Sequence, residues 1–140
     1  MIVVVDTNAL VQMMGQASPF APLKGALEQG HISWAVSTPI LIEYEEVIRR
    51  HAGAAAWAAV ARMIEIISLI RQTIIFTAPT YRFRNITGDP DDDAFADCAI
   101  VANADWIITE DRHFDVMRDG GYKPQPITPE AFIRQHLGSP

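Results

Sequence analysis

The chain has 140 residues, of which 49% are hydrophobic and 20% are charged, a composition typical of a globular protein and not of a disordered or repetitive one. This length suits one core, and no Pro-, Gly- or Ser-rich segment is long enough for a linker, so we expect a single domain over residues 1–140. The net charge of −6 argues against an extended basic surface for nucleic acid, but bound metal ions would offset clustered carboxylates, so a nuclease is not excluded.

Three features indicate location and redox chemistry. The N-terminus has no basic segment and reaches Asp6 before any signal-length apolar run, so we expect a cytoplasmic protein. The most apolar stretch, residues 53–70, contains Arg62, Glu65 and Ser68, and we therefore expect no membrane span. Cys98 is the sole cysteine, which excludes an intrachain disulfide, and its apolar neighbours predict a buried thiol.

Short β-branched runs alternate with helical patterns along the whole chain. Capping residues mark several helix starts, and Gly30 marks a helix end. In chain order the pattern predicts a strand at 2–5, a helix from about 7, a helix at 19–29, a strand at 31–36, a helix from 38 to about 50, a helix at 54–70, a strand at 73–76, a helix from 89, a strand at 106–109, a short helix near 115–117 and a helix at 129–137.

This alternation predicts an α/β sandwich with a mostly parallel central sheet. Asp6 follows the first strand directly, and Asp111 follows the strand at 106–109. Because parallel strands end at the same edge of a sheet, both acids should lie where such sheets bind ligands. Several carboxylates gathered there would repel one another, so we expect a divalent metal ion between them.

The helix that starts at Asp89 carries further acids. Asp89 suits the N-cap, and Asp91 and Asp92 suit the positive end of the helix dipole. Asp93 and Asp97 are four residues apart and share a face, which Ile100, Val101 and Ala104 continue. Since the opposite face is apolar as well, we expect a mostly buried helix whose Asp97, two turns in, needs a partner.

These strings, in this order and spacing, resemble the PIN domain, and the branch that they are most similar to is the toxins of bacterial and archaeal toxin–antitoxin systems related to VapC. The resemblance covers essentially the whole chain. It rests on the segments Val5-Asp6-Thr7-Asn8, Pro39-Ile40-Leu41-Ile42-Glu43-Tyr44, Asp93-Ala94-Phe95-Ala96-Asp97-Cys98-Ala99, Ala104-Asp105-Trp106-Ile107-Ile108-Thr109-Glu110-Asp111 and Pro126-Ile127-Thr128-Pro129-Glu130-Ala131-Phe132.

The resemblance implies a three-layer α/β/α sandwich and a ribonuclease that binds Mg²⁺ or Mn²⁺ and leaves a 5′-phosphate. It implies metal ligands at Asp6, Glu43, Asp93 and Asp111, with Asp97 as a neighbouring acid and with Asn8 and Thr109 as polar residues beside the carboxylates. The residue types by themselves indicate the same metals, because hard oxygen ligands suit Mg²⁺ and Mn²⁺ and no His or Cys spacing suits zinc.

We expect a reaction in which a metal ion assists the attack of water on phosphorus. The roles of Glu43 and Asp97 in this reaction stay open. Glu43 completes the metal shell or acts as general base, and Asp97 holds a water or belongs to a second metal position. Glu110 is an added acid beside Asp111 that is either an exposed side chain or a further ligand. Phosphate contacts are a hypothesis for four arginines, with helix-end or solvated roles as the alternative: Arg82, Arg84, Arg112 and Arg118.

The sequence also suggests binding partners and leaves two other functions open. The apolar helix at 54–70 is mainly core, and its remaining apolar face would suit a homodimer or an antitoxin helix. Two other function classes stay open: a non-catalytic PIN-fold module that binds RNA or protein, and a phosphatase or phosphotransferase with an acidic metal site. The second lacks the further acid two residues after Asp6 that a haloacid-dehalogenase-like nucleophile motif needs.

Overall fold

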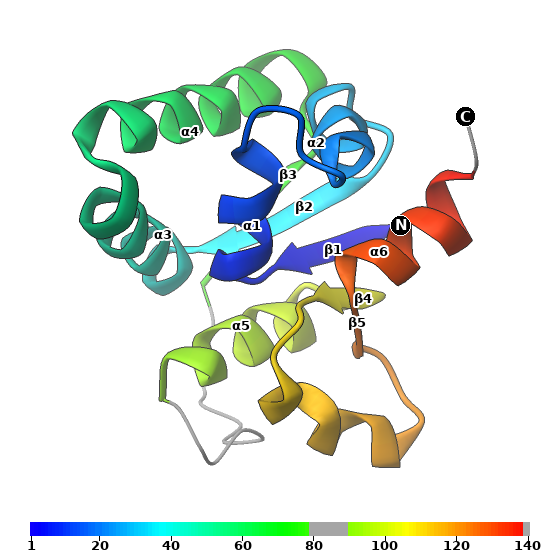
Figure 1. Ribbon diagram of the computed structural model, residues 1–140. Helices are drawn as coiled ribbons and strands as arrows, with labels where there is room; N and C mark the ends of the chain where they lie inside the picture. The colour runs from blue at the N-terminus through cyan, green and yellow to red at the C-terminus, as the bar shows by residue number, and fades with distance from the viewer. Residues whose placement is uncertain (79–89, 139–140) are drawn as a thin grey trace.

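Five parallel strands form one sheet in the order β3-β2-β1-β4-β5 (Figure 1). The computed structural model describes residues 1–78 and 90–138, and the side chains of residues 90–93, 119 and 120 fall outside this description. The elements are β1 (Ile2–Val5), α1 (Thr7–Met14), α2 (Ala21–Glu28), β2 (Ser33–Ser37), α3 (Thr38–Ala52), α4 (Ala54–Ile66), the π-helix η1 (Ile67–Arg71), β3 (Ile74–Thr77), α5 (Pro90–Val101), β4 (Trp106–Ile108), the 3-10 helix η2 (Arg112–Gly120), β5 (Gln125–Ile127), α6 (Pro129–Phe132) and the π-helix η3 (Ile133–Leu137).

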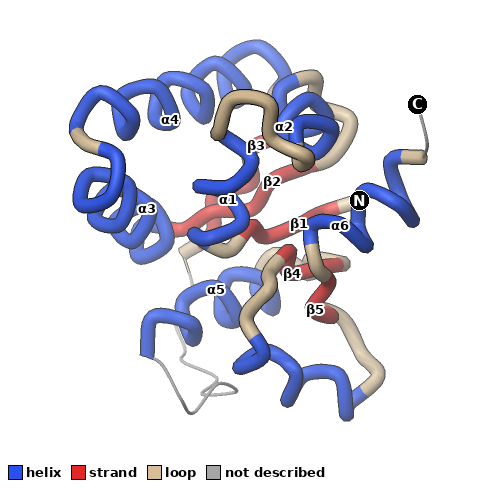
Figure 2. The backbone as a smooth tube through the Cα atoms, in the orientation of Figure 1, coloured by secondary structure: helices blue, strands red, loops and turns tan. Residues whose placement is uncertain are grey.

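Helices cover both faces of the sheet, as Figure 2 shows by colour. In Figure 1, α1, α2, α3 and α4 lie on one side of the strands, and α5 lies on the other. The fully buried side chains of Val3, Val4 and Val5 on β1 and of Trp34 on β2 lie within this core. This arrangement confirms the predicted α/β sandwich with a parallel sheet.

The strand order reverses between β1 and β4, and this switch point positions the candidate site. Chain crossovers run from β1 outward to β2 and β3, and then return across the sheet to β4. Val5 pairs with Ile108, and the N–H of Asp6 donates to the carbonyl of Ile108 at 2.9 Å. The residues that follow β1 and β4 are therefore neighbours, in the place where parallel sheets bind ligands.

Local chemistry explains where several elements begin and end. Ser37 caps α3 by accepting from the N–H of Ile40 at 3.4 Å. Gly30, at φ +72°, ends the turn after α2, and the N–H of His31 donates back to Ala26 at 3.0 Å. His31 and Ile32 therefore belong to this turn, and the predicted strand at 31–36 is observed at 33–37 instead.

Other predicted bounds also need correction. The residue pattern did not predict β5, because its three residues include Pro126, which lacks an N–H. β5 is tolerated at the sheet edge, where it pairs only with β4 among the described strands. The predicted helices at 54–70 and 129–137 are α-helical only to Ile66 and Phe132, and each continues as a π-helix. The short helix predicted near 115–117 is the longer 3-10 helix η2.

The helix α5 is buried mainly through the middle of its described part. Phe95, Asp97 and Cys98 are each less than a tenth exposed, as the sequence predicts. Val101, expected on the buried face, is 46% exposed because it lies in the last turn of the helix. Among the helices of the described residues, none has the length and apolar character of a membrane span.

Candidate active site

Asp6 lies directly after β1 with its carboxylate buried. It is the N-cap of α1, and its Oδ1 accepts from the N–H of Thr7 at 2.8 Å. Its side chain is 6% exposed. A buried carboxylate has to be compensated by donors or cations, so the hydrogen bonds to Asp6 set the chemistry at this point of the fold.

Thr109 connects the ends of β1 and β4. Its hydroxyl donates to Asp6 Oδ2 at 2.7 Å and accepts from the N–H of Asp111 at 2.9 Å. Its own N–H donates to the carbonyl of Ile127 at 2.9 Å, which fixes the residue to β5. One buried side chain therefore holds the Asp6 carboxylate and the backbone of Asp111 in a single hydrogen-bonded unit.

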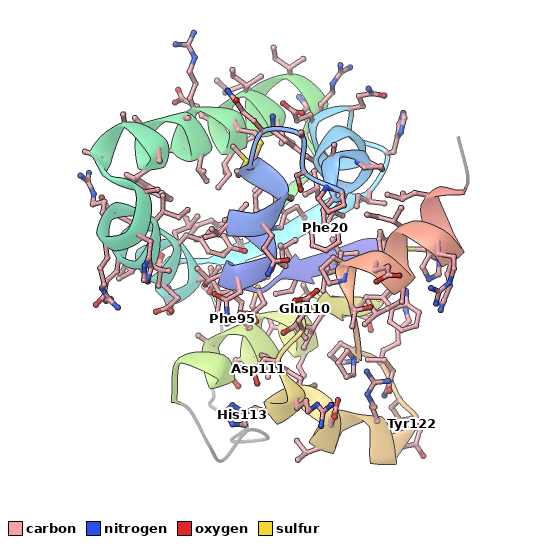
Figure 3. All side chains as sticks on the ribbon, viewed as in Figure 1. Phe20, Phe95, Glu110, Asp111, His113 and Tyr122 are labelled. Atoms are coloured by element: carbon pink, nitrogen blue, oxygen red, sulfur yellow. The ribbon has the colours of Figure 1, made fainter. Side chains whose placement is uncertain are left out.

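Asp111 lies at the start of η2, beside His113. Its Oδ1 accepts from the N–H of His113 at 2.9 Å and lies 3.2 Å from His113 Nδ1. Figure 3 shows both side chains at the start of η2, on the same side of that segment. His113 lies only two residues after Asp111 in the sequence, and the 3-10 turn brings the two side chains into contact.

The remaining predicted ligands lie on α3 and α5. Glu43 is half-buried in the first half of α3, which begins where β2 ends. Asp97 is 6% exposed on α5, whereas only the backbone of Asp93 is described. Among the side chains that the structure describes, no three His, Cys, Asp or Glu residues lie close enough together to hold a metal ion.

The polar residues predicted around the acids differ in their setting. Asn8 is exposed on the first turn of α1, whereas Thr109 is buried against Asp6. Glu110 is exposed, and its Oε2 lies 3.5 Å from the amide nitrogen of Gln12, which favours the surface interpretation of this acid. Two of the predicted phosphate contacts, Arg82 and Arg84, lie outside the described residues. The predicted N-cap Asp89 lies outside them as well.

A polar cleft of about 370 Å³ adjoins the acids on the η2 side. Thr109, Glu110 and Asp111 form one part of its wall, and Arg112 and Arg118 form another. Arg118 pairs with Asp115 at 3.0 Å, whereas Arg112 has no ion pair with any residue that the structure describes. The exposed guanidinium of Arg112 is therefore available to an anion that approaches Asp111.

Two buried side chains near the acids, Cys98 and Tyr44, have raised pKa values. Burial raises the pKa of the Cys98 thiol to about 11, and the nearby charge of Asp97 acts in the same direction. Burial also raises the pKa of Tyr44 well above its ordinary value, with a smaller contribution from Asp6. Both groups are therefore neutral hydrogen-bonding side chains at ordinary pH.

The donor chemistry fits a hard divalent cation. Asp6 and Asp111 provide carboxylate oxygens at adjacent positions of the sheet edge, joined through Thr109. Carboxylate oxygens are the ligands that Mg²⁺ and Mn²⁺ favour, and hydrogen bonds to such ligands fix their orientation. Glu43 and the two acids of α5 come from elements that pack together, because α3 and α5 both contact β2 and one another.

The profile of the PIN domain family matches residues 2–113. The chain belongs to the PIN domain family. That match covers β1 through the start of η2 and includes every segment that holds Asp6, Glu43, Asp93, Asp97 and Asp111. No curated protein sequence matches the chain.

Two solved structures share the PIN fold of this chain. A chain of the VapBC-1 structure from nontypeable Haemophilus influenzae superimposes with a TM-score of 0.55 at 17% identity, over 93% of this chain and 99% of that one. The T. brucei RRP44 PIN domain superimposes with a TM-score of 0.53 at 13% identity, over 97% of this chain and 80% of that one. Identities this low show likeness of fold.

Proposed function

We propose that this PIN domain is a divalent-metal-dependent endoribonuclease and the toxin of a toxin–antitoxin pair. The observation that carries the proposal is the unit of Asp6, Thr109 and Asp111 at the switch point of the sheet. Asp6 caps α1 and Asp111 caps η2, and the two caps lie at adjacent strand ends, where Thr109 joins them. Membership of the PIN family supports nuclease chemistry for such a unit.

In this proposal, Asp6, Asp93 and Asp111 hold one or two Mg²⁺ or Mn²⁺ ions, with Glu43 and Asp97 completing the acidic set. The bound ion supplies positive charge that stabilises the transferring phosphate and favours ionisation of water. Thr109 keeps the Asp6 carboxylate in one orientation through its donated hydrogen bond. Asn8, exposed on the first turn of α1, adds a polar side chain beside the same strand end.

The reaction is a hydrolysis of the phosphodiester bond. The oxygen of a water forms the new bond to phosphorus, the bond from phosphorus to O3′ breaks, and the products are a 5′-phosphate and a 3′-hydroxyl. In this scheme Glu43, which is half-buried on α3, takes the proton of that water. Arg112, which lines the polar cleft beside Asp111, contacts a phosphate of the RNA strand.

The likeness to a VapBC-1 chain supports an antitoxin as partner. An apolar groove of about 410 Å³ lies between α4 and β3, with Trp57, Leu69 and Phe76 among its walls. The side chains of Leu69 and Phe76 are 70% and 60% exposed. We assign this groove to an antitoxin helix, and we propose a cytoplasmic homodimer as the state that binds it; co-purification with the product of an adjacent small gene tests the assignment.

The test of activity is cleavage of a mixed RNA pool by the purified protein with Mn²⁺ or Mg²⁺, compared with EDTA. The variants are Asp6→Asn and Asp93→Asn, and the matched control is Glu46→Gln, an exposed acid of α3 that pairs with Arg50 at 3.1 Å. We expect loss of at least about a hundredfold in rate for both Asn variants, since each removes a charge that holds the metal, and no change for the control.

Cleavage that survives EDTA, or that persists in both Asn variants, contradicts the proposed metal site. A folded wild-type protein that cuts no RNA in a broad pool, and that still binds RNA or an antitoxin, indicates the non-catalytic PIN module instead. Preference for a small phosphomonoester over RNA indicates a phosphatase.

A further inference from the structure

Tyr44 lies where the elements that carry the candidate acids meet. Its side chain is fully buried, and its hydroxyl donates to the carbonyl of Val5, the residue that precedes Asp6. Tyr44 itself follows Glu43 on α3. One side chain thus joins the segment of Glu43 to the end of β1, from which Asp6 projects.

The ring of Tyr44 reaches two further elements. Its centroid is 6.2 Å from the Trp34 ring on β2 and 6.0 Å from the Phe95 ring on α5, with both pairs tilted. Phe95 lies between Asp93 and Asp97 in the sequence of α5. Tilted aromatic pairs at these distances are favourable contacts, so the ring fixes α5 against α3 and the sheet.

The hydroxyl of Tyr44 donates a hydrogen bond to the backbone of β1 at a point where β1 no longer pairs with β2. β1 pairs with β2 at Ile2 and Val3, whereas its pairing with β4 continues to Val5. The carbonyl of Val5 thus lies beyond the last pair of β1 with β2. A buried carbonyl needs a donor, and the Tyr44 hydroxyl supplies it.

We propose that Tyr44 is a positioning residue of the acidic site, which sets the spacing between Asp6, Glu43 and the acids of α5. Its hydroxyl fixes the end of β1, and its ring fixes α5 against α3. The inference rests on the proposed metal-dependent function, because it assigns Tyr44 a role in metal affinity.

The test is a titration of the wild-type protein and its Tyr44→Phe variant with Mn²⁺ alone, in which free Mn²⁺ is followed by electron paramagnetic resonance. Tyr44→Phe keeps the ring contacts and removes only the hydroxyl. We expect Mn²⁺ affinity to fall about tenfold, the size of effect that is typical when a residue supporting a metal ligand is removed. We also expect kcat on RNA to fall while KM stays close to that of the wild type, since the cleft beside η2 is unchanged.

Two controls separate positioning from general stability. Tyr122→Phe removes a hydroxyl from a side chain that is 81% exposed, and it should leave Mn²⁺ affinity unchanged. Phe132→Leu weakens the core at α6, and it should lower the melting temperature without changing Mn²⁺ affinity. Tyr44→Leu removes the ring as well, and it should lower Mn²⁺ affinity further than Tyr44→Phe does.

The possible results of these measurements lead to different conclusions about Tyr44 and about the nuclease. Equal Mn²⁺ affinity in the wild type and in Tyr44→Phe overturns the role of Tyr44 while leaving the nuclease intact. An equal loss of affinity in Phe132→Leu also overturns it, because stability alone would then explain the effect. A folded wild-type protein that neither binds Mn²⁺ nor cuts RNA overturns the proposed function itself, and the role of Tyr44 with it.

Discussion

Thr109 shows how much of the site depends on one hydroxyl group. It donates to Asp6 Oδ2 and accepts from the N–H of Asp111, so it connects groups that follow two neighbouring strands. A hydroxyl in this position fixes the carboxylate without adding charge. Valine has the same shape and would remove both of these hydrogen bonds.

We therefore expect Thr109→Val to lower kcat/KM on RNA by roughly 10- to 100-fold, because the Asp6 carboxylate loses the donor that orients it. The same change should lower the free energy of unfolding by about 1–3 kcal/mol, the cost of buried groups without partners. Thr109→Ser keeps the hydroxyl and serves as the control, with activity near that of the wild type. Initial rates and urea unfolding of both variants measure these effects, and equal rates for Val and Ser would refute the role.

At the scale of elements, Asp105 joins three segments at the start of β4. Its Oδ2 accepts from the N–H of Ile2 at 2.9 Å, and its Oδ1 pairs with Lys123 Nζ at 3.0 Å. The hydrogen bond from Ile2 is the largest single cause that lowers the pKa of Asp105, and Lys123 acts in the same direction. The charged carboxylate thus holds the beginning of β1 and the segment before β5 against β4.

Because the folded state lowers this pKa, the stabilisation is present above the ordinary value of 3.8 and is lost as the pH falls below it. We expect Asp105→Asn to lower the free energy of unfolding by about 1 kcal/mol at pH 7, and the difference from the wild type to shrink toward pH 3. Asp115→Asn, which breaks the exposed pair with Arg118, is the control and should have almost no effect. A deficit in Asp105→Asn that is constant across pH would contradict the prediction.

Elements also show what the sequence could and could not predict. The β-branched runs before Asp6 and Asp111 predicted that both acids lie at one edge of a parallel sheet, and the pairing of β1 with β4 shows that the segments after these strands are neighbours. β5 was missed because three residues that include a proline carry almost no strand pattern. The contacts of Tyr44 depend on how α3 packs across β1 and α5, and a tyrosine among apolar helix residues gives no local sign of such packing.

The balance of charge in the whole molecule bears on its stability. The chain has a net charge of −6, and Asp6 and Asp111 follow neighbouring strands at one edge of the sheet. Thr109 and the N–H of Thr7 donate hydrogen bonds to the carboxylate of Asp6. A ligand that supplies positive charge there would therefore favour the folded state over the unfolded one.

We expect Mn²⁺ to raise the melting temperature of the wild-type protein, since a ligand present at a hundred times its Kd stabilises the folded state by about 2.7 kcal/mol. For a chain of this length such a gain corresponds to a shift of roughly 5–10 °C. The measurement is differential scanning fluorimetry with Mn²⁺ and with EDTA, for the wild type, for Asp6→Asn and for Glu46→Gln. Because Asp6 contributes its carboxylate at the switch point, its variant should show a much smaller shift, while Glu46→Gln should match the wild type. A shift of equal size in all three proteins would mean that Mn²⁺ binds elsewhere on this acidic surface, and the proposed centre would then be wrong.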